Sequence, residues 1–355
     1  MPGAGTAGHD RRRHVRGAGD RRAERRRRLR VRPRRPPRAL DLAHPPVNRP
    51  RVLVTGGSGF VGGAVVPLLR SSGARVRLLA HRRPLVRGPG VEVVDGDLTD
   101  PATLRGICRD VDCVLHLASH VGRDEASGVA VNTDGTRHLV AEAGRAGVGK
   151  FVRLGTAAVY GNGPFREAAE GAVEPRPVSP TSRSRLSGER FVLEAGGAVL
   201  RPYLVYGTGD RWVMPSLLRM LRALRSGLPG HGSALLSLTE VGSLATSLAR
   251  MAVTTPPRRA AGVFHACPPR PVSLRELVVA THRHLGFPLV TGGQPLERAR
   301  AEMVAAGGDG HLLDLFGVDH WFDATRLRTV GDHAPETGLS AGLAAHAAWY
   351  REQLT

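Results

Sequence analysis

The most constraining feature of the sequence is a glycine-rich turn between an apolar segment and a helical one. Residues 51–55 form a short apolar run of the kind found in buried strands, and a helical pattern covers residues 60–72. In the turn between them, Gly56 permits a tight change of direction and Gly59 lets the backbone approach a pyrophosphate. Gly62 lets the helix pack close to a sheet, and the helix N-terminus presents N–H groups to an anion. The predicted dinucleotide contacts of this turn are Gly56, Ser58, Gly59, Phe60, Val61 and Gly62.

Beyond this turn, apolar strand-like runs alternate with helical patterns. The strand-like runs lie at 51–55, 75–80, 91–94, 111–118, 150–155 and 198–201. Helical patterns lie between them, for example at 60–72, 101–109, 132–147 and 182–196. Strands joined by crossover helices favour a parallel sheet with helices on both faces. We therefore predict a doubly wound, parallel-sheet α/β fold of the Rossmann type.

The pattern loosens after about residue 205 and predicts a smaller lobe over the carboxyl ends of the strands. Its helical stretches lie near 213–227, 240–253, 273–285 and 338–353. The predicted regions are a tail at 1–50, the dinucleotide-binding Rossmann domain at 51–205 and mainly the substrate-binding lobe at 206–355. Several apolar side chains of this lobe would line a pocket for a flat apolar substrate or form core: Trp212, Met214, Leu217, Leu218, Met220 and Leu221.

The first 50 residues differ sharply from the rest of the chain. They hold 16 arginines, four acidic residues and almost no apolar periodicity, so we expect them to be disordered. Arginine runs such as residues 25–28 are able to contact nucleic acid phosphates. A tail without function, or a start codon placed too far upstream in GC-rich DNA, is favoured over nucleic acid binding. Residues 51–355 carry 35 basic and 27 acidic groups and are only mildly basic.

Other features favour a cytoplasmic protein that acts on a small molecule. The cysteines Cys108, Cys113 and Cys267 lack metal-ligand spacing, so we expect reduced, buried thiols and no metal site. No apolar run approaches the roughly 20 residues of a membrane span. The basic N-terminus lacks the apolar region of a secretory signal. We expect a monomer or homodimer without a membrane partner.

Several short motifs follow the glycine turn in a characteristic order. They are Asp-Gly-Asp-Leu at 95–98, Leu-His-Leu-Ala at 115–118, Val-Tyr-Gly at 159–161 and Arg-Pro-Tyr-Leu-Val-Tyr-Gly at 201–207. With these motifs, nearly all of residues 51–355 resembles the extended short-chain dehydrogenase/reductase family. The resemblance implies that Asp97 and Leu98 contact the adenine and that Ala118 lies on the nicotinamide side. It also places Pro202 in the cofactor site.

The end of the second predicted strand bears on the choice of cofactor. NAD-specific sites place a carboxylate there for the ribose 2′-hydroxyl. This chain instead has Ala80-His81-Arg82-Arg83, with no acid. A guanidinium binds phosphate in a forked geometry, which suits the 2′-phosphate of NADP(H). We predict NADP(H) over NAD(H), with His81, Arg82 and Arg83 as contacts; the alternative is that the two arginines are solvated loop charges.

The expected catalytic residues depart from the family pattern. Typical members use a Ser or Thr, a Tyr, and a Lys four residues after the Tyr; here the positions correspond to Thr156, Thr181 and Arg185. None of the four tyrosines has a lysine four residues later, because Lys150 is the only lysine. Arg185 would hold the nicotinamide ribose as a permanent cation. Thr156 and Thr181 would contact the carbonyl oxygen, but an aliphatic hydroxyl is too weak an acid to be the proton donor.

Near the fourth predicted strand, one histidine is expected to be structural, and a second histidine and an arginine are expected to lie near the substrate. His116 lies within the apolar strand and is expected to be structural. His120 and Arg123 follow the strand, near the expected position of the substrate.

Three functions remain open. The favoured one is an NADPH-dependent ketoreductase that acts on a lipophilic aromatic or polycyclic intermediate of a polyketide antibiotic pathway, with the proton coming from water or substrate. Hydride transfer needs proximity, orientation and stabilisation of the developing oxyanion. The second is an NADP(H)-binding protein without catalysis. The third is a nucleotide-sugar epimerase or dehydratase, which is disfavoured because a Thr/Arg pair removes a hydroxyl proton poorly.

Overall fold

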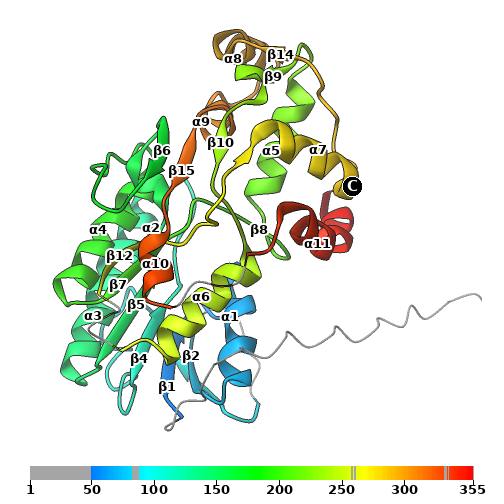
Figure 1. Ribbon diagram of the computed structural model, residues 1–355. Helices are drawn as coiled ribbons and strands as arrows, with labels where there is room; N and C mark the ends of the chain where they lie inside the picture. Colours follow the sequence, from blue (N-terminus) through cyan, green and yellow to red (C-terminus); the bar gives the residue numbers. More distant parts are fainter. Residues whose placement is uncertain are drawn as a thin grey trace, which may run out of the picture. The chain divides into compact units, whose positions relative to one another are not determined.

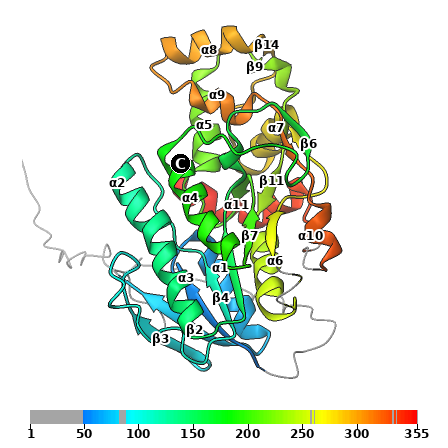
Figure 2. The ribbon, with the colours of Figure 1, turned by 90° about the vertical axis from the view of Figure 1, so that its left-hand side faces the viewer.

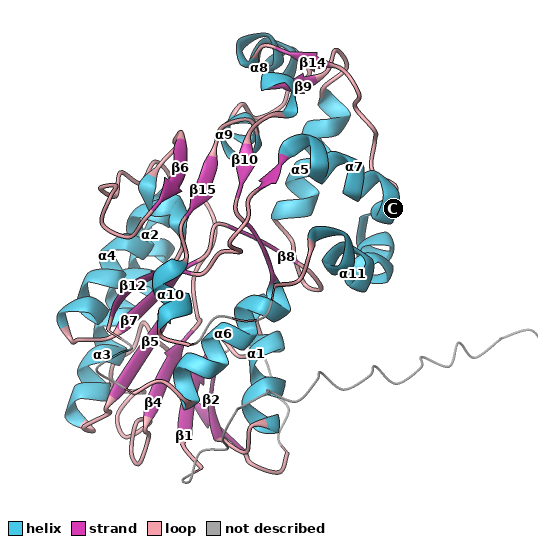
Figure 3. Cartoon of the chain, in the orientation of Figure 1, coloured by secondary structure: helices cyan, strands magenta, loops and turns pink. Residues whose placement is uncertain are grey.

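The apolar run at residues 51–55 forms β1 at the centre of a seven-stranded parallel sheet (Figures 1 and 3). The computed structural model describes residues 49–81, 88–256, 259, 261–331, 334 and 336–354, all within one compact unit of the chain. The strand order is β12-β7-β5-β4-β1-β2-β3, and every neighbouring pair is parallel. The strands are β1 Arg51–Thr55, β2 Arg75–Ala80, β3 Val91–Asp95, β4 Cys113–His116, β5 Lys150–Leu154, β7 Ala198–Arg201 and β12 Gly262–His265.

The sheet is buried on both faces because its strands carry apolar side chains on both sides. In β1, Val52 and Val54 pack into one apolar cluster while Leu53 packs into another, and none of the three is exposed. This alternation follows from the two-residue period of a strand. The predicted fold class, a Rossmann-type parallel sheet, is confirmed.

Helices cover the two faces in pairs (Figures 1 and 2). The helices α1 Phe60–Ser71 and α6 Val241–Val253 contribute buried side chains to the cluster around Val52 and Val54. The helices α3 Gly135–Arg145 and α4 Pro180–Glu194 contribute to the cluster around Leu53. Each pair buries the apolar stripe that its helical period creates.

The strand order reverses between β1 and β4. From β1 the chain proceeds to β2 and β3 on one side, and it then returns to β4, β5 and β7 on the other. In doubly wound folds this switch point opens a crevice at the carboxyl ends of the strands, where ligands bind. The turn after β1 and the loop after β4 meet at this point.

The predicted helix at 101–109 is wrong. The segment instead forms successive turns in which an N–H donates to the carbonyl three residues earlier, as from Leu104 to Pro101 at 3.3 Å. Gly106 adopts a φ of +80° and Asp110 a φ of +56°, which an α-helix does not accommodate. The predicted helix at 132–147 is split, because a π-helical segment, Val129–Asp134, precedes α3.

The elements beyond the central sheet build a second apolar core, in which side chains of α5, α7, α9 and α11 gather. Small strands connect them, in a four-stranded sheet of order β13-β10-β15-β6 and in the pairs β11–β8 and β14–β9. The remaining helices are α2 Glu125–Gly128, α5 Val213–Ala223, α7 Leu274–Leu285, α8 Leu296–Ala305, α9 His311–Phe316, α10 Thr325–Thr329 and α11 Leu339–Leu354, with 3₁₀-helices at Ala157–Tyr160 and Gly230–Gly232. The remaining strands are β6 Phe165–Ala168, β8 Leu204–Tyr206, β9 Leu228–Pro229, β10 Leu235–Leu236, β11 Leu238–Glu240, β13 Val272–Ser273, β14 Gly293–Gln294 and β15 His320–Phe322.

Some residues after 205 belong to the central sheet and not to the second apolar core. Although they follow residue 205, α6 packs on the central sheet and β12 extends its edge. The division at 205 therefore remains a prediction, and the tail at 1–50 lies almost wholly outside the described residues. Cys108, Cys113 and Cys267 are buried and unpaired, as predicted. No described helix has the length and apolar character needed to cross a membrane.

A buried ion pair joins α4 to β7. The Arg201 guanidinium donates from Nε at 2.9 Å and from Nη2 at 2.6 Å to Oε2 of Glu189. The two side chains are 6% and 0% exposed. A carboxylate and a guanidinium this deeply buried depend on each other for charge compensation.

We expect Glu189→Gln to lower the free energy of unfolding by about 3 kcal/mol or more, because it leaves the buried guanidinium without its counter-charge. Urea denaturation followed by circular dichroism measures this change. The control is Asp134→Asn, which removes an exposed 3.2 Å pair with Arg137 on the surface of the same layer. This control should lower the free energy of unfolding by less than about 1 kcal/mol. Equal losses of unfolding free energy in the two variants would contradict the expectation.

Candidate functional site

The predicted glycine turn lies at the switch point and brings three backbone segments into contact. Gly56 has a φ of +71°, and a Cβ there would lie 2.6 Å from the backbone nitrogen of Ala118. A Cβ on Gly62 would collide with the carbonyl oxygen of Gly56. Only glycine allows the turn, the start of α1 and the end of β4 to approach this closely.

The start of α1 is suited to an anion. Gly59 is the N-cap in an extended conformation, no side chain caps the helix and its first turn holds no acidic residue. The helix is 12 residues long, so its N-terminus carries the partial positive charge of a helix dipole. This cradle fits the pyrophosphate of a dinucleotide. The contacts predicted for Ser58, Phe60 and Val61 remain predictions.

The end of β4 is held by buried hydrogen bonds. The N–H of Ala118 donates to Oγ1 of Thr55 at 3.2 Å, and that oxygen lies 2.7 Å from Nδ1 of His116. Nε2 of His116 lies 3.0 Å from the hydroxyl of Thr136. Burial holds the pKa of His116 well below its usual value, and the charges of nearby arginines add to this effect. His116 is therefore a neutral structural residue, as expected.

The residues predicted to bind the adenine half of the cofactor lie at the ends of β2 and β3. Nε2 of His81 lies 3.0 Å from Oδ2 of Asp97, whose Oδ1 accepts hydrogen bonds from Thr99. Leu98 is buried beside Gly135, where α3 begins. Arg82 and Arg83 lie outside the described residues. Because β2 and β3 are paired neighbours, His81 and Asp97 meet at one edge of the crevice.

Thr156 follows β5 and caps the 3₁₀-helix Ala157–Tyr160. Its Oγ1 accepts a hydrogen bond from the N–H of Ala158 at 3.2 Å. That bond uses an oxygen lone pair, so the hydroxyl proton can still be donated. The N–H of Ala157 donates to the carbonyl of Pro202 at 2.8 Å, which places Pro202 beside this turn.

Thr181 and Arg185 lie one turn apart in α4 and contact two different loops. The Thr181 hydroxyl accepts from the N–H of Gly122 at 3.2 Å and donates to its carbonyl at 2.8 Å. Nη2 of Arg185 donates to the carbonyls of Leu154 at 3.2 Å and Gly155 at 2.8 Å. The fold thus brings Thr156, Thr181 and Arg185 to the carboxyl ends of the paired strands β4 and β5, and their catalytic roles remain predictions.

Sequence reasoning missed a buried chain of polar groups beneath this site. Nη1 of Arg201 donates to the Tyr160 hydroxyl at 2.9 Å, and that hydroxyl lies 2.8 Å from Nε2 of His265. Nδ1 of His265 donates to the Asp323 carbonyl at 3.0 Å, so Nε2 accepts the Tyr160 proton. Burial raises the pKa of Tyr160 and lowers that of His265. Both hydrogen-bonding functions of the Tyr160 hydroxyl are thus occupied within this buried chain. Tyr160 and His265 are 105 positions apart, and no local sequence pattern predicts a contact over that separation.

An open groove of about 510 Å³ begins at Tyr160 and follows the segment after β5. Phe165, Val173 and Val178 give it an apolar lining, and Glu174 and Arg176 lie along it. Of the two alternatives for the apolar side chains of α5, a pocket lining or core, the structure confirms core for five of them: Met214, Leu217, Leu218, Met220 and Leu221. Trp212, just before α5, is 57% exposed.

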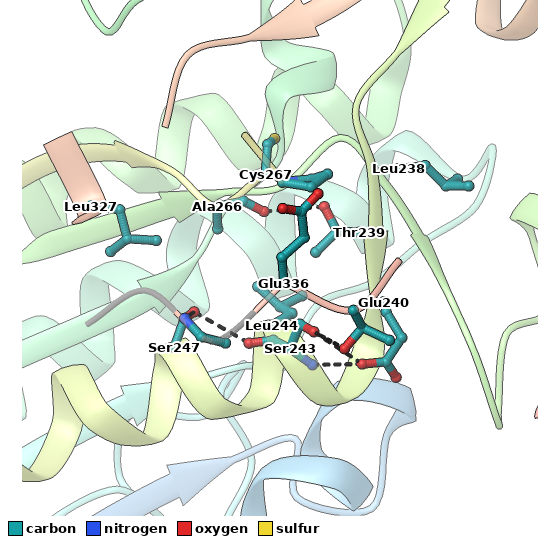
Figure 4. Close-up of a pocket in the computed structure, with 13 residues that line it drawn as sticks. Leu238, Thr239, Glu240, Ser243, Leu244, Ser247, Ala266, Cys267, Leu327 and Glu336 are labelled. Atoms are coloured by element: carbon teal, nitrogen blue, oxygen red, sulfur yellow. Dashed lines mark hydrogen bonds between the residues drawn. The ribbon is translucent and has the colours of Figure 1, made fainter. Parts of the chain in front are cut away.

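A second, small cavity of about 30 Å³ lies beside the start of α6 and contains none of the predicted site residues (Figure 4). Glu240 at its edge caps α6 by accepting from the N–H groups of Gly242 and Ser243, both at 2.7 Å. It also accepts from Nε2 of His346 on α11 at 2.8 Å. Burial opposes ionisation of Glu240, but the hydrogen bonds outweigh it and hold its pKa below the usual value. These contacts hold α6 and α11 together.

We expect Gly62→Ala to weaken NADPH binding at least ten-fold, because the new methyl group would push α1 away from the Gly56 carbonyl. Fluorescence titration measures the dissociation constant. Gly63→Ala is the matched control, since a Cβ on Gly63 meets nothing within 4 Å. That control should bind normally and gain up to about 1 kcal/mol of stability from the better helix propensity of alanine. Normal binding by Gly62→Ala would contradict the assigned cradle.

Comparison with known proteins agrees with this geometry. Residues 52–258 match the sequence model of the NAD dependent epimerase/dehydratase family. The chain is 28% identical over 326 residues to the 2-alkyl-3-oxoalkanoate reductase of Stenotrophomonas maltophilia (strain K279a), covering 82% of this chain and 97% of that protein. It is 27% identical over 263 residues to the 4-hydroxy-2-methyl-3-oxo-4-farnesyl-3,4-dihydroquinoline-1-oxide ketoreductase of Stigmatella aurantiaca, covering 71% of this chain and 78% of that protein.

Two solved structures with the same fold contain NAD. MoeE5 in complex with UDP-glucose and NAD is 27% identical with a TM-score of 0.66, over 86% of this chain and 100% of that one. A short-chain dehydrogenase/reductase superfamily protein from Agrobacterium tumefaciens with bound NAD is 26% identical with a TM-score of 0.68, over 86% of this chain and 98% of that one. Because the family match spans more than half of the chain, this protein belongs to the NAD-dependent epimerase/dehydratase family of extended short-chain dehydrogenases/reductases and is an NAD(P)-dependent oxidoreductase.

Proposed function

We propose that this protein is an NADPH-dependent ketoreductase that reduces a carbonyl on a lipophilic aromatic or polycyclic molecule, such as a polyketide antibiotic intermediate. The reduction proceeds without a tyrosine general acid. The reduced nicotinamide, when bound, supplies the hydride that reaches the carbonyl carbon. The residues of this chain position the ketone, stabilise its oxygen and provide for its protonation.

The observation that carries this proposal is the set of hydrogen bonds that already occupy the side chains of Thr181 and Arg185. The only proton of the Thr181 hydroxyl is donated to the Gly122 carbonyl, and a contact with substrate would require that bond to break. Arg185 holds two backbone carbonyls and keeps its charge at neutral pH, so it cannot serve as a base. Neither Thr181 nor Arg185 therefore supplies the base that oxidation of a sugar hydroxyl needs. Reduction of an activated ketone requires less acid–base catalysis from these two side chains.

Thr156 and Arg185 supply the polar part of the proposed site. The Thr156 hydroxyl only accepts in its bond from Ala158, so its proton is available to the carbonyl oxygen as negative charge develops there. The positive charge of Arg185, held against the end of β5, favours the nicotinamide ribose and the developing charge. Gly56 and Gly62 keep the pyrophosphate cradle open on the other side of the crevice.

The apolar groove and the relatives support a lipophilic ketone as substrate. The groove starts at Tyr160, the last residue of the 3₁₀-helix that Thr156 caps, and Phe165, Val173 and Val178 give it apolar walls. The two reductases described above are named for a 3-oxoalkanoate and for a farnesyl-bearing 3-oxo-quinoline oxide. Both names describe a ketone on a largely apolar molecule.

The same family also includes proteins that bind nucleotide sugars, as the MoeE5 complex with UDP-glucose illustrates. A nucleotide-sugar epimerase or dehydratase is therefore the second candidate function. A protein that binds NADP(H) without catalysis is the third. Turnover of a sugar nucleotide distinguishes the second from the other two.

The proposed preference for NADP(H) rests on the end of β2, where the chain reads Ala80-His81-Arg82-Arg83 and offers no carboxylate. His81 lies against Asp97, so the nearest acid after β3 is already engaged. The guanidinium groups of Arg82 and Arg83 suit a 2′-phosphate.

Titration should show NADPH binding at least ten-fold tighter than NADH. The double variant Arg82→Ala/Arg83→Ala should lose this difference by weakening NADPH binding alone, because NADH has no 2′-phosphate. Arg351→Ala, which removes an exposed guanidinium on α11, is the charge control. Tighter binding of NADH by the unaltered protein would overturn the NADP(H) preference.

Ketone reduction is tested by mixing the protein and NADPH with 1-hydroxyanthraquinone, 3-oxodecanoic acid or UDP-glucose and following nicotinamide absorbance and products. We expect turnover of a ketone and none of UDP-glucose. Thr181→Ala should keep kcat within about ten-fold, whereas Thr156→Ala should lower it about a hundred-fold, because only the latter removes an oxyanion donor. Sugar conversion without ketone reduction would favour the second function, and no turnover at all would favour the third.

A further inference from the structure

His120 lies in the loop after β4 and its backbone is held on both sides by one buried side chain. Oδ1 of Asn132 accepts from the N–H of His120 at 2.8 Å, and Nδ2 of Asn132 donates to the His120 carbonyl at 2.9 Å. The same amide donates to the Ser184 hydroxyl on α4 at 3.0 Å. Asn132 is fully buried, so the position of His120 is fixed relative to both β4 and α4.

The imidazole of His120 has a buried nitrogen that nothing in the described part of the chain satisfies. Nε2 is inaccessible to solvent and has no hydrogen-bond partner among the described residues. Leaving such a group unpaired costs about 1–3 kcal/mol. An unpaired buried polar atom in a folded protein calls for an explanation, and a catalytic role is one of the recognised explanations.

The neighbours of this nitrogen place it at the proposed reaction centre. A Cβ built on Gly122 would lie 3.2 Å from Nε2. Gly122 is the residue whose N–H and carbonyl both bind the hydroxyl of Thr181. Thr181 stands at the position of the tyrosine that family members use as acid. The unpaired nitrogen of His120 is therefore next to the residue that replaces the missing proton donor.

Other unpaired buried atoms do not share this setting. Nη1 of Arg153 and Oε1 of Glu189 belong to the charged groups packed beneath α4, where Arg153 also donates to the Asn132 carbonyl. A guanidinium does not exchange protons near neutral pH, whereas an imidazole does. Among these atoms, Nε2 of His120 has both the chemistry and the position of a proton donor.

We propose that His120 is the catalytic acid of this protein and that its Nε2 donates the proton to the substrate carbonyl oxygen. This assignment rests on the proposed ketone reduction. As hydride reaches the carbonyl carbon, the C=O π bond breaks and the oxygen takes the proton from the imidazolium. The ketone is reduced to an alcohol, the dinucleotide is oxidised, and the neutral imidazole regains its proton from water. No further co-reactant is required.

Several charged groups lie on the elements near His120. Asp124, the N-cap of α2, is close enough for a favourable electrostatic interaction with it. Hydrogen bonds from Ser127 are the main cause of the lowered pKa of Asp124. Arg123 is 95% exposed and pairs with Asp309, while Arg185 on α4 points to the carbonyls after β5. Glu125 on α2 pairs with Arg183 of α4.

The first test compares the unaltered protein with His120→Gln in NADPH-dependent reduction of 1-hydroxyanthraquinone. We expect kcat to fall about a hundred-fold or more, in line with the loss of a general acid, while the dissociation constant of NADPH and the Tm stay unchanged. For the unaltered protein, kcat should fall as pH rises, because only a protonated acid donates a proton. His120→Gln should lack that pH dependence.

The matched control is His284→Gln on α7, whose ring bonds the Ser340 hydroxyl at 2.8 Å far along the chain from this site. It should keep both the rate and the pH profile. A His120→Gln variant that reduces the ketone within three-fold of the unaltered rate overturns the assignment and leaves the proposed function standing.

A second measurement does not depend on turnover. In protein labelled with ¹⁵N-histidine, the Nε2 resonance of His120, identified by its absence in His120→Gln, should shift when NADP⁺ and 1-naphthol are added together. The aryl hydroxyl of 1-naphthol stands in for the product alcohol. If the unaltered protein reduces no ketone, the proposed function fails, and this spectrum decides on His120: an unmoved resonance overturns its contact with a substrate oxygen.

Discussion

At the switch point of the sheet, the turn after β1 touches the start of the loop after β4 with no side chain between them. Gly56 meets the backbone of Ala118, and Gly62 meets the carbonyl of Gly56. The crevice, the pyrophosphate cradle and the position of the β4 loop all depend on this contact. A single methyl group would separate the segments, because backbone atoms cannot rotate away as a side chain can.

The polar groups under the crevice give the loops their fixed positions. Asn132 binds the backbone of His120 and the hydroxyl of Ser184, and Thr181 binds Gly122. Beneath them, Glu189 and Arg201 form a buried ion pair between α4 and β7. Buried polar groups of this kind contribute less to net stability than to a unique arrangement, since each has few alternative partners. Here that arrangement leaves one imidazole nitrogen unpaired.

The local sequence pattern was sufficient to predict the strands of the central sheet, but not every helix or pocket. The apolar runs predicted six of its strands, because strands buried on both faces are nearly continuous in apolar residues. The segment 101–109 failed because Gly106 takes a left-handed conformation that interrupts the helical pattern. The helical period of the apolar side chains of α5 fitted either a pocket wall or a core, and packing against α8 and α9 made them core.

The sequence by itself determined the dinucleotide turn, the alternation of strand-like and helical segments along the chain, and the absence of a tyrosine with a lysine four residues later, since each depends on neighbouring residues alone. Only the tertiary structure decided that the Thr181 hydroxyl is bound to Gly122, 59 residues away, and that His120 keeps an unpaired nitrogen beside it. Hydrogen-bond partners across such separations follow from where the fold brings the loops together. No periodicity or spacing along the chain encodes that meeting point.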